Sequence, residues 1–211
     1  MLSIVGASFG RTGTSSAREA LVRLGFGPCH GMRQLFTDDG HAAAWLRAAD
    51  GGPVDWPRLL DGYRATVAWP ASYFWRELAD AFPRARVLLL ARDPARWYDS
   101  VAATLFRTRP ADATTDARTP IRDRAIERIV WQGTFGGRFA DREYAIGVYG
   151  DHLARVRREV PANRLVEVDV ADGWAPLCAA LDVAVPDEPF PVANTTEEYL
   201  TRARRAGALA D

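Results

Sequence analysis

Short apolar runs alternate along the chain with longer segments in which apolar residues recur every three or four positions. The runs at 2–7, 65–69, 86–91 and 165–170 predict strands, and 26–29 is either a short strand or a loop. The helical spacing predicts helices at 17–24, 32–36, 42–49, 56–63, 71–82, 124–131, 144–160, 175–181 and 197–210, and one more that opens at Asp93-Pro94. Strands that alternate with helices indicate an α/β fold with a mainly parallel central sheet covered on both faces.

Residues 108–123 interrupt this alternation. The segment is polar and contains Pro110 and Pro120, so we expect a mobile excursion or lid. Five arginines flank it, and they are either solvated or in contact with a phosphate or an anionic acceptor: Arg107, Arg109, Arg118, Arg122 and Arg124. We find no internal repeat and no domain break, and 211 residues suit one compact domain over 1–211.

The chain has 27 Lys+Arg and 27 Asp+Glu, so its formal net charge is zero. A non-specific nucleic-acid binder usually has an excess of basic residues, so this class of protein is disfavoured. All the basic residues are arginines, and without lysine the chain can form no Schiff base to pyridoxal phosphate. No apolar run approaches the ~20 residues that cross a bilayer, and no signal-peptide pattern opens the chain. We therefore expect a cytoplasmic protein without membrane contact. Two cysteines, Cys29 and Cys178, make neither a disulfide scaffold nor a structural zinc site.

A loop rich in glycine and hydroxyl residues joins the first strand to the first helix. It reads Gly6-Ala7-Ser8-Phe9-Gly10-Arg11-Thr12-Gly13-Thr14-Ser15-Ser16. Glycines let the backbone approach a ligand closely, and the free amides and dipole at a helix N-terminus favour an anion. Arg11 adds a fixed charge, and Thr12, Thr14, Ser15 and Ser16 add hydroxyl donors. The loop predicts a phosphate or sulfate cradle, with a tight turn and an ordinary helix cap as the alternative.

The loop fits neither of two common nucleotide motifs. A Walker loop needs a lysine, and here Gly10 falls one position early while Arg11 stands in the glycine position. A dinucleotide fingerprint nearly fits Gly6, Gly10 and Gly13, but it also needs an acidic residue for the ribose after the second strand. Residues 26–30 offer none, and the Tyr-x-x-x-Lys pair of short-chain dehydrogenases is impossible without lysine. A nicotinamide enzyme of these types is therefore disfavoured.

A second constellation follows the clearest strand, 86–91. Arg92 stands at the carboxyl end of that strand, where open α/β sheets bind their ligands. Ser100 lies about two turns into the helix that follows, so the two side chains can meet on one phosphate. The alternative is an arginine paired with Asp93 or Asp99 and a surface serine.

Together the two segments resemble the sulfotransferases that use 3′-phosphoadenosine 5′-phosphosulfate (PAPS). The family's 5′-phosphosulfate loop resembles residues 8–16, and its 3′-phosphate motif, an Arg at a strand end and a Ser eight residues later, resembles Arg92 and Ser100. More narrowly, the chain is similar to a bacterial and fungal branch often labelled as epimerases. That resemblance rests on residues 11–16, 24–29, 69–70, 74–78, 92–94, 173–178 and 189–191, together with Trp97 and Asn194, in the family's order over nearly the whole chain.

The resemblance implies a three-layer P-loop-NTPase-like fold and transfer of a sulfuryl group from PAPS to a hydroxyl or amine of a small-molecule acceptor. The product nucleotide would be 3′,5′-bisphosphoadenosine (PAP), and no metal is implied. The residues expected to bind the cofactor are Gly10, Arg11, Thr12, Gly13, Thr14, Ser15, Ser16, Arg92 and Ser100. Arg11 stands where the family has a loop lysine, so we expect it to act as an electrostatic clamp on the leaving oxygen.

The general base is where this chain departs from the family pattern. This branch has an Asp before Trp-Pro, and here Ala68 precedes Trp69-Pro70. Several residues are candidate substitutes: His30, Asp38, Asp39, His41 and Glu77. His30 lies near the expected end of the second strand and has the most suitable unperturbed pKa, so it is our candidate catalytic base. His152, in the helix 144–160, is interpreted as a packing residue.

Other functions stay open at this point. The chain could be a non-catalytic PAPS- or PAP-binding protein that lost its base at Ala68. It could also be a P-loop-like nucleotide-dependent kinase, which would need Mg²⁺ and ATP, or an NAD-dependent epimerase. The sequence names neither the acceptor nor the oligomeric state.

Overall fold

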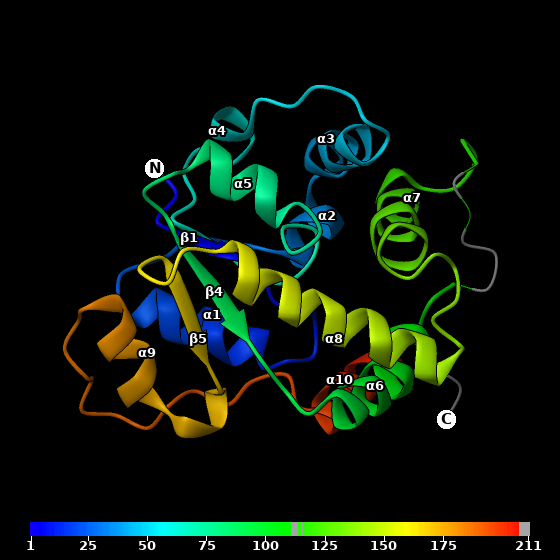
Figure 1. Cartoon of the computed structure of the whole chain (residues 1–211). Helices are drawn as coiled ribbons and strands as arrows, with labels where there is room; N and C mark the ends of the chain where they lie inside the picture. The colour runs from blue at the N-terminus through cyan, green and yellow to red at the C-terminus, as the bar shows by residue number, and fades with distance from the viewer. Residues whose placement is uncertain (111–113, 115, 207–211) are drawn as a thin grey trace.

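Five parallel strands form the centre of the molecule in this computed structural model, which describes residues 1–110, 114 and 116–206. The sheet order is β2-β3-β1-β4-β5 (Figure 1). The strand bounds are β1 Ile4–Gly6, β2 Cys29–His30, β3 Ala65–Thr66, β4 Arg86–Leu90 and β5 Leu165–Val168. In register, Ile4 lies opposite both Ala65 and Arg86. The predicted α/β fold with a parallel central sheet is confirmed.

Helices and helical turns connect the strands. Their bounds are α1 Thr14–Arg23, α2 Met32–Thr37, α3 Asp39–Ala49, α4 Trp56–Leu59, α5 Trp75–Ala81, α6 Pro94–Val101, η1 Ala102–Phe106, α7 Ile121–Ile126, η2 Glu127–Thr134, α8 Arg142–Glu159, η3 Val170–Asp172, α9 Trp174–Leu181 and α10 Thr196–Arg205. Of the three η elements, η1 and η2 are π-helical and η3 is a 3₁₀ turn.

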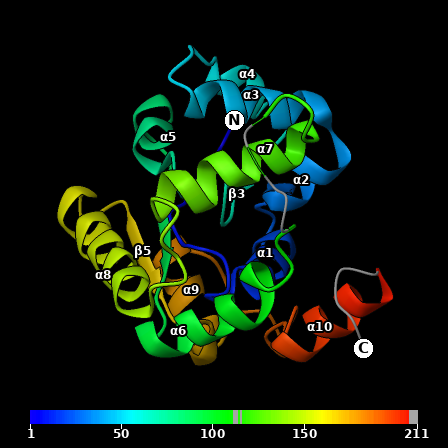
Figure 2. The same cartoon turned by 90° about the vertical axis from the view of Figure 1, so that its right-hand side faces the viewer.

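Two layers of helices cover the sheet. On one face, Leu88 and Val166 pack with Ala20 of α1 and Leu177 of α9. The other face packs against a larger cluster to which α3, α5, α6, α8 and η2 contribute. Figures 1 and 2 show α1 and α9 on one side of the strands and α8 on the other. Because both faces are buried, β4 is apolar at four consecutive positions, which is why its sequence pattern was so clear.

Several boundaries differ from those that the pattern predicts. Helix α1 begins at Thr14, three residues before the predicted 17, because its first turn is built from loop hydroxyl residues. The predicted helix 56–63 ends at Leu59, and the predicted helix 71–82 starts at Trp75 after a series of turns. Of the predicted strand 65–69, only Ala65 and Thr66 pair in the sheet.

The predicted excursion at 108–123 is shorter than expected. Residues 111–113 and 115 lie outside the described residues. Ile121 to Asp123 form the first turn of α7, so this part of the prediction is wrong. Pro120 is the N-cap of that helix, where its missing amide costs nothing. The N-terminal end of the predicted excursion is also held in place, because the guanidinium of Arg109 donates two hydrogen bonds of 2.8 Å to the buried carboxylate of Glu127.

Within the described part of the chain, no helix combines the length and the apolar character needed to cross a bilayer. Helix α10 ends at Arg205, and the end of the predicted helix 197–210 falls outside the described residues. In Figure 1 the carboxyl end of β4 points toward α6 and α10, so these helices stand at the edge of the sheet where parallel α/β proteins bind ligands.

Candidate functional site

The glycine-rich loop is fixed to the sheet at its start. A Cβ on Gly6 would lie 2.4 Å from the carbonyl oxygen of Thr66, so only glycine fits where β1 passes β3. The Ser8 hydroxyl donates to the Leu88 carbonyl at 3.2 Å and accepts from the Leu90 amide at 2.7 Å. The loop therefore leaves the sheet between β1 and β4 with little freedom.

The middle of the loop curls back toward α1. Arg11 has a φ of 70° and Gly13 a φ of 90°, two left-handed residues that reverse the chain. The indole N–H of Trp97 donates to the Gly10 carbonyl at 3.2 Å, and the Thr12 hydroxyl donates to the Phe9 carbonyl at 2.8 Å. These bonds turn loop carbonyls away from the space in front of α1. The first amides of a helix have no partners within the helix, so the anion cradle at the start of α1 stays a prediction.

The predicted hydroxyl donors divide into two groups. Thr12 is occupied within the loop, and the Ser16 hydroxyl accepts from the Ala193 amide at 3.1 Å. Among the described residues, no hydrogen bond involves the hydroxyls of Thr14 and Ser15. Thr14 and Ser15 are therefore the loop hydroxyls that a ligand can use without breaking a bond inside the protein.

Arg11 is almost buried, with 9% of its surface exposed, and every part of its guanidinium is in contact with the protein. Its Nε donates to the Ser100 hydroxyl at 3.2 Å. Its Nη1 donates to the Asn194 carbonyl at 2.9 Å, and its Nη2 to the Thr196 hydroxyl at 3.2 Å. The ring of Tyr199 lies 5.5 Å from the guanidinium carbon. All four partners are neutral.

Arg92 and Ser100, predicted to share one phosphate, both meet Arg11. The Nη1 of Arg92 donates to the Arg11 carbonyl at 3.0 Å, and Ser100 accepts from the Arg11 side chain. The Arg92 backbone amide donates to the Tyr149 hydroxyl at 3.0 Å, which fixes the end of β4. Asp93 caps α6 through the Arg96 amide instead of pairing with Arg92. The structure thus brings the loop and the second constellation into one site.

Three arginines gather here, and no carboxylate among the described residues pairs with any of them. Burial lowers the pKa of Arg11 from its usual value; Tyr199 opposes this, and the charges of Arg92 and Arg202 lower the pKa further. None of the three arginines forms an ion pair with a carboxylate among the described residues. Guanidinium groups stay protonated in proteins, so the cluster keeps its charge. A multiply charged anion is the ligand that such a site suits.

His30, the candidate base, lies at the end of β2 in a different environment. It is completely buried, and its ring packs against His41, Trp45 and Tyr63. Burial, helped by the neighbouring His41, lowers the pKa of His30 to about 3. Among the described residues, no hydrogen bond joins His30 to Arg11. The structure therefore does not bring His30 to the arginine cluster, and its role as base stays a prediction.

The contacts of the His30 ring select its tautomer. The indole N–H of Trp45, which can only donate, points at His30 Nε2 over 3.4 Å. Nε2 must therefore accept, and the proton of the neutral ring sits on Nδ1. His41 Nδ1, 3.2 Å from the same Nε2, then acts as a second donor. His30 Nδ1 is buried without a protein partner among the described residues.

The other candidate bases lie near His30 or on the surface. The side chain of His41 is 4.0 Å from the Asp38 carboxylate, and the Asp38 carboxylate also accepts from the His41 amide. That amide bond lowers the pKa of Asp38. Asp39 is exposed in the first turn of α3, and Glu77 is exposed on α5. Among these residues, His41 and Asp38 line a cavity in the described part of the chain.

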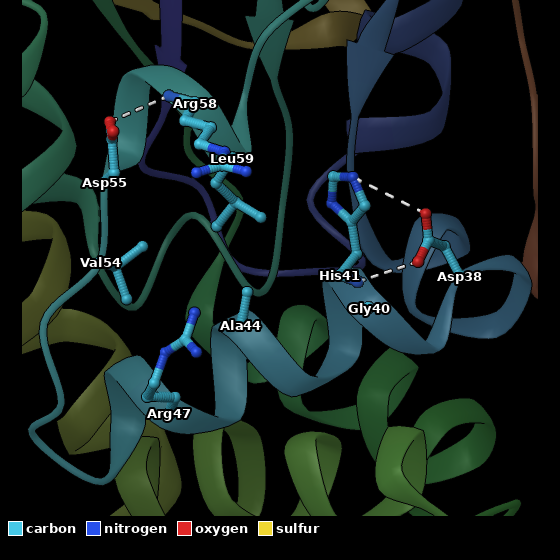
Figure 3. A pocket seen from close by; sticks show the side chains of 9 residues that line it. All are labelled: Asp38, Gly40, His41, Ala44, Arg47, Val54, Asp55, Arg58 and Leu59. Carbon is cyan, nitrogen blue, oxygen red and sulfur yellow. Dashed lines mark hydrogen bonds and ion pairs between the residues drawn. The ribbon is translucent and has the colours of Figure 1, made fainter.

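That cavity, of about 520 Å³, lies between α3 and the segment that contains α4. Figure 3 shows His41 at one end and the side chains of Arg47 and Arg58 directed into the space at the other. Val54 and Leu59 supply the apolar wall. His41 lines the cavity, whereas His30 does not. The ring of His41 stacks on the ring of His30 and lies between His30 and the cavity.

Ala68, at the family's base position, has a φ of 54°, which places it in the left-handed region. Aspartate adopts this conformation more readily than alanine, so the backbone here suits the residue that the family carries. Trp69 next to it is buried and stacks on Phe9 with 4.9 Å between ring centroids. A Cβ on Gly10 would lie 2.9 Å from the Trp69 ring. These aromatic rings form the wall beside the loop.

His152 is a packing residue, as interpreted from the sequence. Its Nε2–H donates to the Ala7 carbonyl at 2.6 Å, and its ring stacks on Phe9 at 4.1 Å. Burial lowers the pKa of His152 to about 4. Cys29 is buried as well, and burial raises the pKa of its thiol to about 11, so it is unreactive at neutral pH.

Sequence reasoning missed the contribution of the C-terminal segment to this site. Thr196, Tyr199 and Arg202 surround Arg11, although Thr196 lies 185 positions further along the chain. The capping box formed by Thr195 and Glu198 predicts where α10 begins, but no local pattern tells which surface the helix covers.

Across the described ranges, no three His, Cys, Asp or Glu side chains gather in a way that could hold a metal ion.

Comparisons with known proteins agree with this geometry. A family model described as a sulfotransferase domain matches residues 3–199. A curated relative, Ava biosynthesis cluster protein M of Aspergillus versicolor, is 30% identical over 205 residues, which cover 89% of this chain and 78% of that protein. The crystal structure of a sulfotransferase from Alicyclobacillus acidocaldarius matches with a TM-score of 0.52 and 17% identity, over 99% of this chain and 92% of that one. This structural match confirms the predicted P-loop-like α/β fold.

Proposed function

The chain belongs to the sulfotransferase family, and we propose from this premise that it transfers a sulfuryl group from PAPS to a hydroxyl or amine of a small-molecule acceptor. The proposed location is the cytoplasm. The observation that carries the proposal is the charge of Arg11, Arg92 and Arg202 around the loop between β1 and α1, which no carboxylate pairs with among the described residues. PAPS carries phosphate groups at both ends of its ribose, so it needs anion-binding groups in two places.

The residues divide into two anion-binding groups. The amides at the start of α1, with the unoccupied hydroxyls of Thr14 and Ser15, suit the 5′-phosphosulfate. Arg92 and Ser100 suit the 3′-phosphate, and Gly10 and Gly13 let the loop pack closely on Trp69 and Val170. When bound, PAPS supplies the sulfuryl group and leaves as PAP.

Arg11 stands between the two groups. Its backbone lies in the loop, while its side chain reaches Ser100. A guanidinium keeps its charge at every working pH, so Arg11 stabilises developing negative charge without giving up a proton. We assign Arg11 the electrostatic role that the sequence predicts. Its side chain also contacts Ser100, one of the two residues proposed to bind the 3′-phosphate.

His30 is the proposed base, and this role would require a specific tautomer of its ring and access to the acceptor. Among the described residues, Nδ1 of His30 has no protein partner, so the acceptor proton would have to move to Nδ1. This needs the tautomer in which Nε2–H donates to His41 Nδ1, against the preference set by Trp45. It also needs His41 and α3 to move, because His30 has no exposed surface. An acceptor whose hydroxyl is already acidic would need no such base.

The burial of His30 and the presence of Ala68 favour one alternative, a protein that binds PAPS or PAP without catalysing transfer. Such a protein would keep the arginine cluster and the loop. A nucleotide-dependent kinase is less well supported, because the loop lacks the lysine that Walker motifs place on the phosphates.

Calorimetric titration with PAP, beside ATP–Mg²⁺ and NADP, tests the proposed donor site. Micromolar binding of PAP with no binding of the other two is expected. Binding of ATP–Mg²⁺ in place of PAP would overturn the donor assignment. Incubation with PAPS and a panel of phenols, alcohols and amines then separates the enzyme from the binding protein, since any sulfated product establishes transfer.

A further inference from the structure

The cavity beside α3 contains two arginines that do not belong to the cluster around Arg11. Arg47 lies on α3 and Arg58 on α4, and in Figure 3 both side chains are directed into the same space. No ion pair joins either guanidinium to a carboxylate among the described residues. Two guanidinium groups that face one cavity favour a ligand with a carboxylate, which their forked donors match.

The acidic side chains at the cavity are engaged by backbone amides. Asp38 accepts from the His41 amide at 3.0 Å as the cap of α3, and Asp55 accepts from the Arg58 amide at 3.1 Å as the cap of α4. A side-chain oxygen in this role satisfies an amide that has no partner within the helix. The two carboxylates therefore stabilise helix ends, and the guanidinium groups stay available to a ligand.

The aliphatic stem of Arg47 is held against the loop that follows α3. The Gly52 amide donates to the Arg47 carbonyl at 2.8 Å, and a Cβ on Gly52 would lie 2.6 Å from Cγ of Arg47. The missing side chain at position 52 thus lets the stem of Arg47 lie on the backbone. Because part of this side chain is already packed, its guanidinium loses less conformational freedom when it binds an anion.

The other end of the cavity offers hydrogen-bond acceptors. His41 Nδ1 donates to His30 Nε2 in the tautomer derived above, so His41 Nε2 of the neutral ring is an acceptor. It lies 4.0 Å from Asp38 Oδ2, which is too far for a hydrogen bond and leaves a gap between two acceptors. One of these acceptors carries a negative charge. An amino group, which is positively charged and has several N–H donors, suits this gap.

Between its two ends the cavity is apolar. Ala44, Val54 and Leu59 supply the aliphatic side chains there. His41 and Arg47 are six residues apart on α3, which corresponds to about 9 Å along the helix axis. The volume of about 520 Å³ falls within the range of roughly 300–1,000 Å³ that is usual for small-molecule sites.

We propose that this cavity binds a small zwitterion, with its carboxylate on Arg47 and Arg58, its amino group on Asp38 and His41, and an apolar segment between them along α3. Figures 1 and 2 both show α3 and α4 at the opposite end of the molecule from α10, so the cavity lies apart from the arginine cluster. The inference adds a binding site outside the donor site and does not rest on the proposed function.

Three matched probes test the two ends of the cavity. Para-aminomethylbenzoate carries both charges on a rigid apolar ring, para-toluate lacks the amino group, and benzylamine lacks the carboxylate. In NMR titrations of the unaltered chain, the zwitterion is expected to bind about tenfold more tightly than either of the other two, since each end adds a charge-assisted contact. Equal affinities of the three probes, or no saturable binding of the zwitterion, would overturn the inference.

Variants at each end then assign the contacts. Arg47→Gln and Arg58→Gln should each weaken binding of the zwitterion about tenfold and reduce its advantage over benzylamine. Asp38→Asn keeps a cap for the His41 amide but removes the charge, so it should reduce the advantage of the zwitterion over para-toluate. If Asp38→Asn weakens para-toluate as much as the zwitterion, the amino group does not lie at this end and the inference is wrong.

The neighbouring helix offers the control for net charge. Arg33 on α2 is exposed and does not line the cavity. Arg33→Gln removes the same charge as Arg47→Gln and should change the affinity for para-aminomethylbenzoate less than about twofold. Equal losses in Arg33→Gln and Arg47→Gln would show a general effect of net charge and would overturn the site. Titration of PAP is a separate experiment, so failure of the donor assignment leaves this test unaffected.

Discussion

Arg92 is the residue whose role follows most directly from its position. It stands one turn before Arg96, at the carboxyl end of β4, with its guanidinium on the Arg11 carbonyl and no acidic partner among the described residues. A charge-assisted hydrogen bond contributes about 1.5–3 kcal/mol. Arg92→Ala should therefore weaken PAP binding by about this free energy, roughly 10- to 150-fold, in a calorimetric titration. Arg96→Ala removes an exposed arginine from the following helix and should leave the affinity nearly unchanged. Equal affinities of the two variants would remove Arg92 from the site.

How much the sequence predicts of the site depends on how local each contact is. The spacing of Arg92 and Ser100 places both at one strand end, and the glycine pattern places the loop, so these contacts follow from neighbours in the chain. Arg202 meets Arg11 only because α10 folds across the carboxyl edge of the sheet. The sequence also placed His30 at a strand end correctly, but its burial comes from the packing of α3, which no local pattern reports.

At the scale of elements, the turn from the loop into α1 depends on Gly13. Its φ of 90° is one that alanine rarely adopts, and a Cβ there would lie 2.4 Å from a methyl group of Val170. Gly25, after the same helix, has a φ of 82° but nothing within 4 Å of its missing Cβ. Gly25→Ala should thus cost only the backbone strain, about 1–2 kcal/mol in the free energy of unfolding. Gly13→Ala should cost more, because the steric clash adds to the same strain.

Urea unfolding of the two glycine variants measures the difference, and a third variant assigns its cause. Val170→Ala combined with Gly13→Ala removes the clashing methyl groups, so the double variant should regain part of the stability lost in Gly13→Ala. If Gly13→Ala and Gly25→Ala lose the same stability, the close approach of η3 to the loop does not restrict this turn.

Element boundaries were predictable where one period dominates and uncertain where two structures meet. The apolar run of β4 and the long α8 match their predicted ranges to within two residues at each end. Helix α6 continues into the π-helical η1, and α7 into η2, at positions where the apolar spacing alone gives one uninterrupted helix. An α-helix and a π-helix differ in the carbonyl to which each amide donates its hydrogen bond. Apolar periodicity does not indicate which carbonyl that is.

At the scale of the whole molecule, two buried histidines govern stability in mild acid. The pKa values of His30, about 3, and His152, about 4, both lie below the ordinary value of 6.5, mainly because burial disfavours the charged ring. Between pH 6.5 and about 4 the unfolded chain therefore binds protons that the folded chain does not. As the pH is lowered through this range, the free energy of unfolding should decrease by up to about 1.4 kcal/mol per pH unit for each histidine. Above pH 7 these two groups should not affect it.

Urea titrations at pH 7.5, 6.0 and 5.0 measure this slope. His152→Gln retains a donor for the Ala7 carbonyl but no longer titrates, so its slope should be lower by about one histidine's share. The carboxylates whose pKa values are lowered, such as Asp141 and Glu159, titrate mainly below this window and do not obscure it. An unchanged slope in His152→Gln would mean that His152 is not held in its neutral form by the fold.

The contact between α10 and Arg11 has a consequence during synthesis on the ribosome. Arg11 is translated 191 positions before Arg202, which at 5–20 residues per second is an interval of roughly 10 to 40 s. Even after β1 and β4 have been translated, the nascent chain lacks the helix that packs on Arg11 until that interval ends. Because a nucleotide stabilises only a chain that can bind it, we expect the proposed nucleotide to contribute little to early folding. The sheet should then form on its own packing, before the proposed nucleotide can stabilise it.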